Sequence, residues 1–389
     1  MKTVKRRRTK WRWLSHRLGV LLAFCLAIIA CFVNPMLQYG NNNGEDEFIM
    51  TRNRKLFFKS NTGQRVEVLF ANFSVGGKQV NWYRYSPSMI QKARRQMQRS
   101  KKKGKPSIVF GILSSPENRE ARQAIRDSWG KEEAIFFVVA GKPSGLEFHR
   151  ELANSHDMVH LEAREDYRSG LTRKTMLIIH LFHHLFDADC RQSCYDYLFK
   201  TDDDSYVNTT QLRLELSDKD PKTLEPIEYY GEPSVKTEPD RDPSSRYYTS
   251  LEEFPGNFYP PYAFGMGYAL SSNLVGCINH QMAQVRKHLP WEDVATGRLV
   301  KKCDAKLTWA HWSLPGYPAK WQVGYFPYDT LKAGGHSVTL VHGVKNPSYM
   351  NLLHHQLPLP APIEIVQIEV SNFSDQKETD AFGEFPHMD

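Results

Sequence analysis

The hydrophobic pattern of the chain changes from continuous runs to helical spacing and back within its central part. Residues 107–113 and 135–139 are almost entirely apolar, which is typical of strands buried on both faces of a parallel sheet. Between residues 171 and 186 apolar side chains recur at helical spacing, and residues 195–199 again form a mostly apolar run. This alternation predicts an α/β fold in which helices flank a parallel sheet.

A helix is expected directly after the first of these strands. Ser114 or Ser115 can cap its beginning, and Pro116 suits its first turn. Ala121 and Ile125 give the helix one apolar face, so it can pack on the sheet.

The N-terminal pattern is different, because residues 18–37 form an apolar stretch without a charged side chain. A helix of about twenty such residues can cross a bilayer. Residues 1–17 carry eight Lys and Arg and no acid, so we expect a cytoplasmic N-terminus and a lumenal remainder, which is type II topology. A cleaved signal peptide also fits a basic start and a short apolar core, and the anchor is preferred.

Residues 38–105 begin polar and end in a basic run, which predicts a stem that leads to the folded domain. Residues 66–70 and 80–83 could form a small β element within it. The basic run could meet an acidic polymer or acidic lipid, and a solvated tether is the preferred interpretation. The predicted division is a tail at 1–17, an anchor at 18–37, a stem at 38–105, a folded domain at 106–356 and an extension at 357–389.

Charge and cysteine content narrow the functional classes. The 389 residues carry 51 Lys and Arg against 43 Asp and Glu, and the tail accounts for the whole net charge of +8. Nucleic-acid binding therefore loses its main support. Four cysteines lie beyond the apolar stretch, an even number that fits two disulfides of open connectivity in an oxidising compartment. These are Cys190, Cys194, Cys277 and Cys303.

The apolar run at 195–199 leads into three adjacent carboxylates, Asp202, Asp203 and Asp204. Adjacent carboxylates repel one another, so a bound cation is the natural explanation for the cluster. Mg²⁺ or Mn²⁺ completes its shell with water and substrate phosphates, which indicates a nucleotide or another phosphorylated substrate. In α/β sheets ligands bind beyond the carboxyl ends of strands, where these residues lie. A solvated acidic turn is the alternative.

Several motifs follow one another in a fixed order between residues 107 and 356. In this order they resemble the β1,3-galactosyltransferase and β1,3-N-acetylglucosaminyltransferase family, glycosyltransferase family 31. The resemblance implies a GT-A fold, in which a Rossmann-like sheet binds a nucleotide sugar. The motifs are residues 122–129, 171–175, 200–204, 246–248, 259–268, 292–297 and 341–347.

The resemblance also implies roles for individual residues. Asp202 and Asp204 would hold Mn²⁺ or Mg²⁺, and His342 would add a nitrogen ligand. The cation would neutralise the charge that develops on the departing UDP. The implied donor-binding residues are Arg122, Arg126, Lys174, Asp202, Asp203, Gly265, Gly267, Glu292 and Lys345. Tyr262, Tyr268 and Trp291 could offer flat faces to sugar rings or pack in the core, and the sequence leaves both open.

A β bond made from an α-linked UDP-sugar requires a carboxylate that takes the proton from the attacking hydroxyl. Asp293 is flanked by apolar side chains that could raise its pKa, but Glu292 at a helix start fits the residues equally well. The resemblance favours Asp293 as the base, with Glu292 as a neighbour that orients the acceptor.

The resemblance implies an inverting transferase that moves a hexose, with galactose from UDP-galactose preferred over other UDP-sugars, to a glycan on a glycoprotein, glycolipid or proteoglycan in β1,3 linkage. It would lie in the Golgi membrane with a lumenal catalytic domain, and a homodimer is left open. The alternatives are a β1,3-N-acetylglucosaminyltransferase and a non-catalytic lumenal chaperone or glycan-binding relative. Nucleic acid is not expected as a partner.

Overall fold

The computed structural model describes residues 49–51, 55–59, 65–75, 79–141, 146–187, 195–217, 226–285, 288–310, 312 and 339–356. The predicted tail, anchor and C-terminal extension lie outside these ranges. Within the described part of the chain, no helix combines the length and apolar character needed to cross a membrane.

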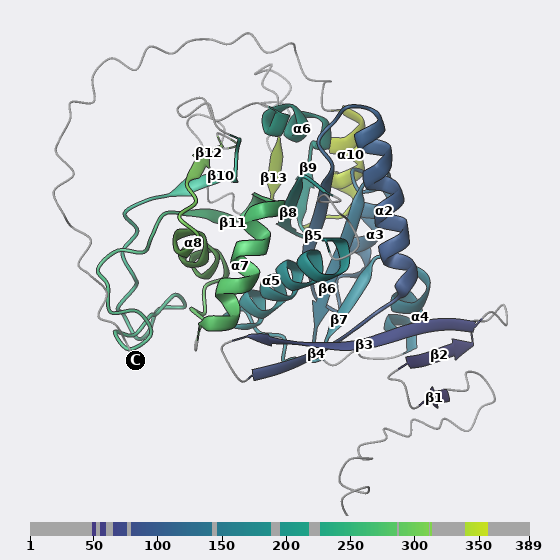
Figure 1. Cartoon of the computed structure of the whole chain (residues 1–389), viewed down its shortest axis with the longest axis horizontal. Coiled ribbons are helices and arrows are strands. Elements are labelled where there is room, and N and C mark those ends of the chain that lie inside the picture. Colours follow the sequence, from purple (N-terminus) through teal and green to yellow (C-terminus); the bar gives the residue numbers. More distant parts are fainter. Residues whose placement is uncertain are drawn as a thin grey trace, which may run out of the picture. The chain divides into compact units, whose positions relative to one another are not determined.

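An eleven-stranded sheet forms the centre of the domain, in the order β1-β2-β3-β4-β7-β6-β5-β8-β11-β10-β12 (Figure 1). Its central strands β7, β6, β5 and β8 are parallel, while β4 and β11 run antiparallel on either side of them. The strands are β1 Ile49–Thr51, β2 Lys55–Lys59, β3 Arg65–Val75, β4 Gln79–Tyr85, β5 Ile108–Ser114, β6 Ala134–Ala140, β7 Met158–Leu161, β8 Tyr197–Asp202, β10 Tyr229–Ser234, β11 Tyr262–Ser271 and β12 Leu307–Trp309.

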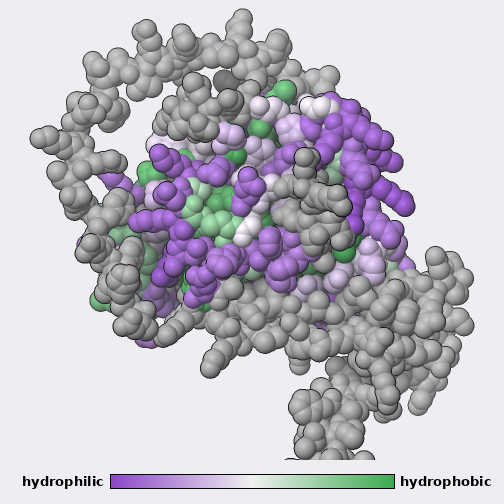
Figure 2. Space-filling view, viewed as in Figure 1, coloured by the Kyte–Doolittle hydropathy of each residue, from purple (hydrophilic) through white to green (hydrophobic). Residues whose placement is uncertain are grey.

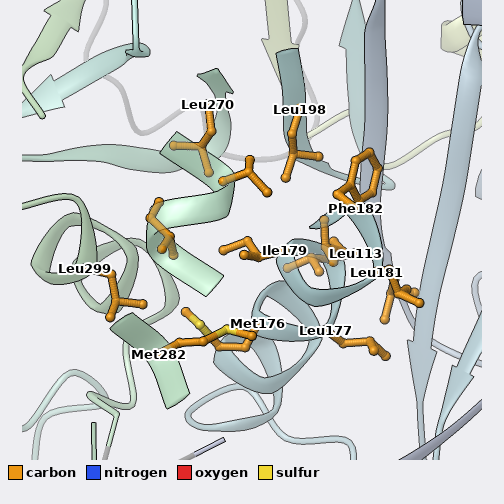
Figure 3. Close-up of a cluster of buried hydrophobic side chains, with 14 of the residues drawn as sticks. Leu113, Met176, Leu177, Ile179, Leu181, Phe182, Leu198, Leu270, Met282 and Leu299 are labelled. Atoms are coloured by element: carbon orange, nitrogen blue, oxygen red, sulfur yellow. The ribbon is translucent and has the colours of Figure 1, made fainter. Parts of the chain in front are cut away.

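The apolar runs of the sequence become the central strands because both faces of these strands are covered. In β5, Val109 and Leu113 face one hydrophobic cluster, while Phe110 and Ile112 face the other. Figure 3 shows the first cluster, where Met176 and its neighbours pack against strand side chains. The sequence prediction of a parallel sheet buried on both faces is thus confirmed.

Helices on the two faces complete this α/β arrangement. Residues of α2, α5, α7 and α8 contribute to the first cluster, and residues of α3, α4, α6 and α10 to the second. The helices are α2 Pro87–Lys102, α3 Arg119–Asp127, α4 Leu146–Asn154, α5 Gly170–Leu181, α6 Thr209–Ser217, α7 Ser272–Gln284, α8 Glu292–Lys302 and α10 Ser348–Gln356, with a π-helical turn η1 Phe182–Asp187 after α5.

Part of the predicted stem belongs to this sheet. β3 and β4 form an antiparallel hairpin, as the sequence predicted, and β4 also pairs with β7. α2 then buries Met89, Ala93 and Met97, which lie on one helix face because they are spaced by four residues. The folded domain therefore begins before residue 106, and the basic run is helix surface instead of a tether.

The helix after β5 begins later than predicted. Ser114 ends the strand and does not cap α3, whose N-cap is Asn118 without a side-chain cap bond. Ile125 is buried as expected, whereas Ala121 is only partly buried. In the intervening turn, the carbonyl oxygens of Ser115 and Pro116 accept hydrogen bonds from the Arg122 guanidinium.

One disulfide lies among the described residues and joins Cys277 on α7 to Cys303 at the end of α8. It fits the oxidising compartment predicted from the cysteine count. The bridge closes a chain segment with a sequence separation of 26 residues. Crosslinks of about this span stabilise domains by about 3 kcal/mol. Cys190 and Cys194 lie outside the described ranges.

Candidate functional site

The three carboxylates lie at the carboxyl end of β8, next to the end of the parallel strand β5, where Leu113 is the register partner of Asp202. Their side chains point in different directions. Asp203 turns back toward β5 and α3, where its Oδ2 accepts hydrogen bonds from Ser114 at 2.7 Å and Asn118 at 2.9 Å. Burial raises the pKa of Asp203 to about 6 despite these hydrogen bonds. Asp202 and Asp204 are left to face a common centre.

His342 completes this centre from a distant part of the sequence. A second sheet pairs β9, Ser205–Val207, with β13, Leu340–His342, and sets His342 opposite Ser205. His342 Nε2 lies 3.3 Å from Asp204 Oδ1 and 3.6 Å from Asp202 Oδ2. One ligand atom from each residue lies within 4.8 Å of the others. The structure thus brings together the three predicted metal ligands.

The electrostatics of this cluster favour a cation. Burial acts to lower the pKa of His342, but hydrogen bonds to Asp202 and Asp204 and their charges raise it to about 9. Burial acts to raise the pKa of Asp204, yet its hydrogen bonds with His342 and Lys345 and their charges bring it well below its ordinary value. Two carboxylates and an imidazole are suitable donors for Mn²⁺ or Mg²⁺, so these residues fit such an ion. Lys345 donates a hydrogen bond to Asp204 at the edge of the cluster, and its predicted contact with the donor diphosphate stays a prediction.

Lys200 connects the metal cluster to the neighbouring helix and was not singled out in the sequence. Its side chain is buried, and its Nζ lies 3.0 Å from both Asp202 Oδ1 and Glu292 Oε2. Nζ also donates to the carbonyl oxygen of Gly265 at 2.5 Å. A lysine two residues before the carboxylates, at the end of an apolar strand, is the sequence signal that could have indicated this role.

Glu292 and Asp293 begin α8 but occupy different environments. Glu292 is buried and accepts a hydrogen bond from the Tyr268 hydroxyl at 2.5 Å in addition to its ion pair with Lys200. Asp293 is partly buried, and its Oδ1 accepts the backbone N–H of Val294 at 2.9 Å. Burial, followed by the charge of Glu292, raises the pKa of Asp293 to about 6. Within the acidic pair, Asp293 is therefore the carboxylate whose raised pKa suits a proton acceptor.

The two glycines of β11 lack a side chain for different reasons. A side chain on Gly265 would place its Cβ 3.1 Å from Glu292 Oε2 and 3.7 Å from Asp293 Oδ2. A Cβ on Gly267 would instead lie 3.1 Å from both Leu340 and Phe199. Gly265 thus keeps space beside the acidic pair, whereas packing against Leu340 and Phe199 explains Gly267, whose role in donor binding stays a prediction.

Arg122 and Arg126, expected near the nucleotide, are used in internal ion pairs. Arg122 is fully buried and binds Glu151 through two hydrogen bonds of 2.9 and 2.7 Å. Arg126 binds Glu151 and also Asp157, which directly precedes β7 and so lies at the opposite edge of the sheet from Asp202. The structure does not bring these guanidinium groups to the metal cluster.

Lys174 is also buried, and its Nζ donates to the Ser114 carbonyl oxygen at 2.8 Å and to Glu165 at 2.6 Å. Arg122 donates to the Ser114 hydroxyl at 2.9 Å, and this hydroxyl donates to Asp203. Arg122 and Lys174 therefore hold the end of β5, and Ser114 links them to the acidic turn.

The aromatic residues named from the sequence belong to the core. Tyr268 is fully buried, and Tyr262 and Trp291 are 7% and 8% exposed. Two other aromatics, Tyr167 and Tyr247, are 48% and 52% exposed. The exposed aromatic rings that a sugar could meet therefore belong to residues that the sequence analysis did not assign to sugar binding, and they lie edge to face with an interplanar angle of 65°.

This aromatic surface lies close to the acidic pair. The Tyr247 ring centroid is 5.6 Å from that of Trp291, the residue before Glu292. The Arg246 guanidinium lies 3.7 Å from the centre of the Tyr167 ring. Burial raises the pKa of Tyr167 to about 12, and the charge of Asp293 adds to this increase. The exposed rings thus stand beside the candidate proton acceptor.

Among known proteins, this chain is similar to galactosyltransferases. The profile of a family described as galactosyltransferase matches residues 120–310. Beta-1,3-galactosyltransferase 4 of Rattus norvegicus is 33% identical over 226 residues, covering 49% of this chain and 59% of the relative. Beta-1,3-galactosyltransferase 5 of Homo sapiens is 29% identical over 219 residues, covering 53% of this chain and 66% of the relative. Beta-1,3-galactosyltransferase GALT1 of Arabidopsis thaliana is 30% identical over 202 residues, covering 49% and 30%.

The chain spans 59% and 60% of the length of the galactosyltransferase 4 proteins from rat and dog. The region matched by the family profile contains the acidic turn, Gly265 and the start of α8, whereas His342 lies beyond it. Over residues 120–310 the chain is thus similar to the galactosyltransferase family, and its ordered motifs and α/β sheet agree with that similarity.

Proposed function

We propose that this protein is a metal-dependent UDP-sugar transferase that moves galactose to a glycan hydroxyl in β1,3 linkage. The observation that carries the proposal is the convergence of Asp202, Asp204 and His342 at the carboxyl edge of a GT-A-like sheet. The relatives' names support galactose as the sugar and β1,3 as the linkage.

The cluster of Asp202, Asp204 and His342 would hold Mn²⁺ or Mg²⁺. When bound, such an ion supplies positive charge to the diphosphate of the departing UDP. Lys345, at the exposed edge of the cluster, adds a further charge that the diphosphate can meet. Lys200 keeps Asp202 ionised and oriented from the protein side.

Asp293 would accept the proton of the acceptor hydroxyl. The hydroxyl oxygen bonds to the anomeric carbon, the bond from that carbon to UDP breaks, and the proton passes to the Asp293 carboxylate. Because attack comes from the side opposite UDP, the α-linked donor yields a β-linked product. Tyr167 and Tyr247 offer exposed rings near Asp293 on which an acceptor sugar can stack. Glu292 is held by Lys200 and Tyr268, so it acts by positioning β11 and α8.

We further propose a lumenal location in the Golgi, with residues 18–37 as a type II membrane anchor. The apolar stretch and the basic tail support the anchor, and the Cys277–Cys303 disulfide supports an oxidising compartment. Protection of the folded domain from protease in intact microsomes is the expected result. Its digestion there would contradict this topology.

The activity is tested by incubating the purified protein with Mn²⁺, a panel of glycan acceptors and UDP-galactose, UDP-N-acetylglucosamine or UDP-N-acetylgalactosamine in turn. The expected result is transfer from UDP-galactose, with a β1,3 linkage in the NMR spectrum of the product. Transfer from UDP-N-acetylglucosamine alone would replace the proposed donor by the alternative one. An α-linked product would contradict the role given to Asp293.

A further inference from the structure

A strongly basic surface lies on α2, outside the site described above. The segment from residue 87 to 106 contains eight Lys and Arg and no Asp or Glu. Its apolar side chains Met89, Ala93 and Met97 are buried in the core, so the basic residues occupy the outer face. Figure 2 shows continuous hydrophilic surface over the position of α2.

Part of this face forms a groove of about 400 Å³ between α2 and the turn before β7. Its cationic lining is Lys92, Arg95 and Arg99, with His156 from the turn. The three basic side chains lie along one helix face, because they are spaced by three and four residues. The remaining lining is polar and uncharged, consisting of Ser88, Gln91 and Gln96.

The charges of the groove are mostly not neutralised by the protein. Lys92 lies 3.4 Å from Asp157, but Asp157 is buried and also pairs with Arg126. Arg95 and Arg99 are exposed and make no ion pair with any residue that the structure describes. Exposed arginines without carboxylate partners are suited to bidentate binding of sulfate or carboxylate groups.

The groove is separate from the proposed catalytic centre. Asp157 and His156 directly precede β7, so the groove lies at the edge of the sheet where the parallel strands begin. Asp202 ends β8, which runs in the same direction, and so lies at the opposite edge. The groove therefore cannot be a part of the diphosphate site.

We propose that this basic groove binds a linear anionic glycan that carries sulfate or carboxylate groups. Its cations Lys92, Arg95 and Arg99 follow the axis of α2 over about 10 Å, a linear arrangement that matches a chain. A membrane surface is a poorer match, because interfacial helices insert an apolar face and that of α2 is buried in the core. Binding at this groove does not depend on sugar transfer.

The test uses the full chain and a heparin octasaccharide as the probe. Arg95→Gln with Arg99→Gln removes two charges from the groove. The control is Lys302→Gln with Lys306→Gln, which removes two exposed charges near β12, the last strand of the sheet order, whereas the groove lies beside β7. Because each lost contact weakens polyanion binding and lowers its salt dependence, the groove variant should bind at least about tenfold more weakly at physiological salt. The control should change less than about twofold.

A second readout places binding on the helix itself and is independent of the basic tail. The octasaccharide should protect Arg95 and Arg99 from an arginine-modifying reagent, while Arg119, 58% exposed in its side chain, remains reactive. Equal losses in the two variants, or no protection of Arg95 and Arg99, would overturn the proposal. Loss of binding to phosphatidylserine vesicles with unchanged octasaccharide binding would show a membrane site instead. UDP-galactose turnover with an uncharged acceptor is measured in parallel, so that failure of the proposed activity is distinguished from failure of the groove.

Discussion

Replacing Asp293 by Asn should stabilise the protein at neutral pH while it abolishes transfer. Burial raises the pKa of this carboxyl from its ordinary value of 3.8 to about 6. The folded protein therefore retains a proton that the unfolded chain releases, and stability falls as the pH rises through this window. A difference of about two pKa units corresponds to ~3 kcal/mol. The free energy of unfolding is lower by this full amount once the pH exceeds about 6. A neutral Asn does not incur this cost.

The assay is urea unfolding of wild type and Asp293→Asn at a series of pH values from 4 to 8. The advantage of the variant should be small at the acidic end and grow to at most ~3 kcal/mol at neutral pH. Asn can still accept the Val294 N–H, so the backbone bond is retained. Glu292→Gln provides the contrast: it weakens a buried ion pair with Lys200 and should destabilise the protein by about 1–3 kcal/mol.

Transfer by the same Asp293→Asn protein should fall by about 10²- to 10⁴-fold, the usual cost of losing a general base, while its Mn²⁺-dependent affinity for UDP stays near that of wild type. In the wild type, kcat/KM should rise as the pH increases through about 6, because the base acts in its deprotonated form. The reasoning is refuted if the variant turns over within a few-fold of wild type, or if it is less stable than wild type at pH 8.

Two further substitutions test the supporting contacts. Lys200→Met leaves the buried carboxylate of Glu292 and the neighbouring Asp202 without their partner, and should cost about 3–5 kcal/mol in urea unfolding; a loss below about 1 kcal/mol would contradict its assigned role. Gly265→Ala places a methyl group 3.1 Å from Glu292 Oε2 and should reduce turnover, whereas Gly276→Ala, with its nearest neighbour at 3.7 Å, should leave kinetics unchanged. Equal turnover of these two variants would argue against a crowded space at Gly265.

The strands could be predicted from the sequence because continuous apolar runs have few alternatives in an α/β fold. β5, β6 and β8 follow these runs closely, and the acidic turn lies at the strand end where fold logic places it. α2 was missed because its six basic residues hide three buried side chains at a spacing of four. In such a segment the exposed face dominates composition, although the buried face determines the structure.

The parts of the site that depend on long-range pairing could not be derived from the sequence pattern. His342 reaches the carboxylates through a ladder of three residue pairs between β9 and β13, and no local pattern encodes that ladder. From the sequence, Arg122 and Arg126 were expected to bind a ligand. Their ion-pair partners Glu151 and Asp157 could not be recognised because they follow only after the next strand. Spatial partners decide whether a charged residue binds a ligand or stabilises the fold.

The central claim is that sugar transfer depends on a metal ion held by Asp202, Asp204 and His342. The most direct measurement follows galactose transfer from UDP-galactose by one preparation before chelation with EDTA, after chelation, and after Mn²⁺ is restored, in wild type and in Asp204→Asn. Wild-type activity should disappear on chelation and return with Mn²⁺, while the variant should stay inactive throughout. Undiminished wild-type transfer after exhaustive chelation, or transfer by Asp204→Asn within a few-fold of wild type, would contradict the central claim.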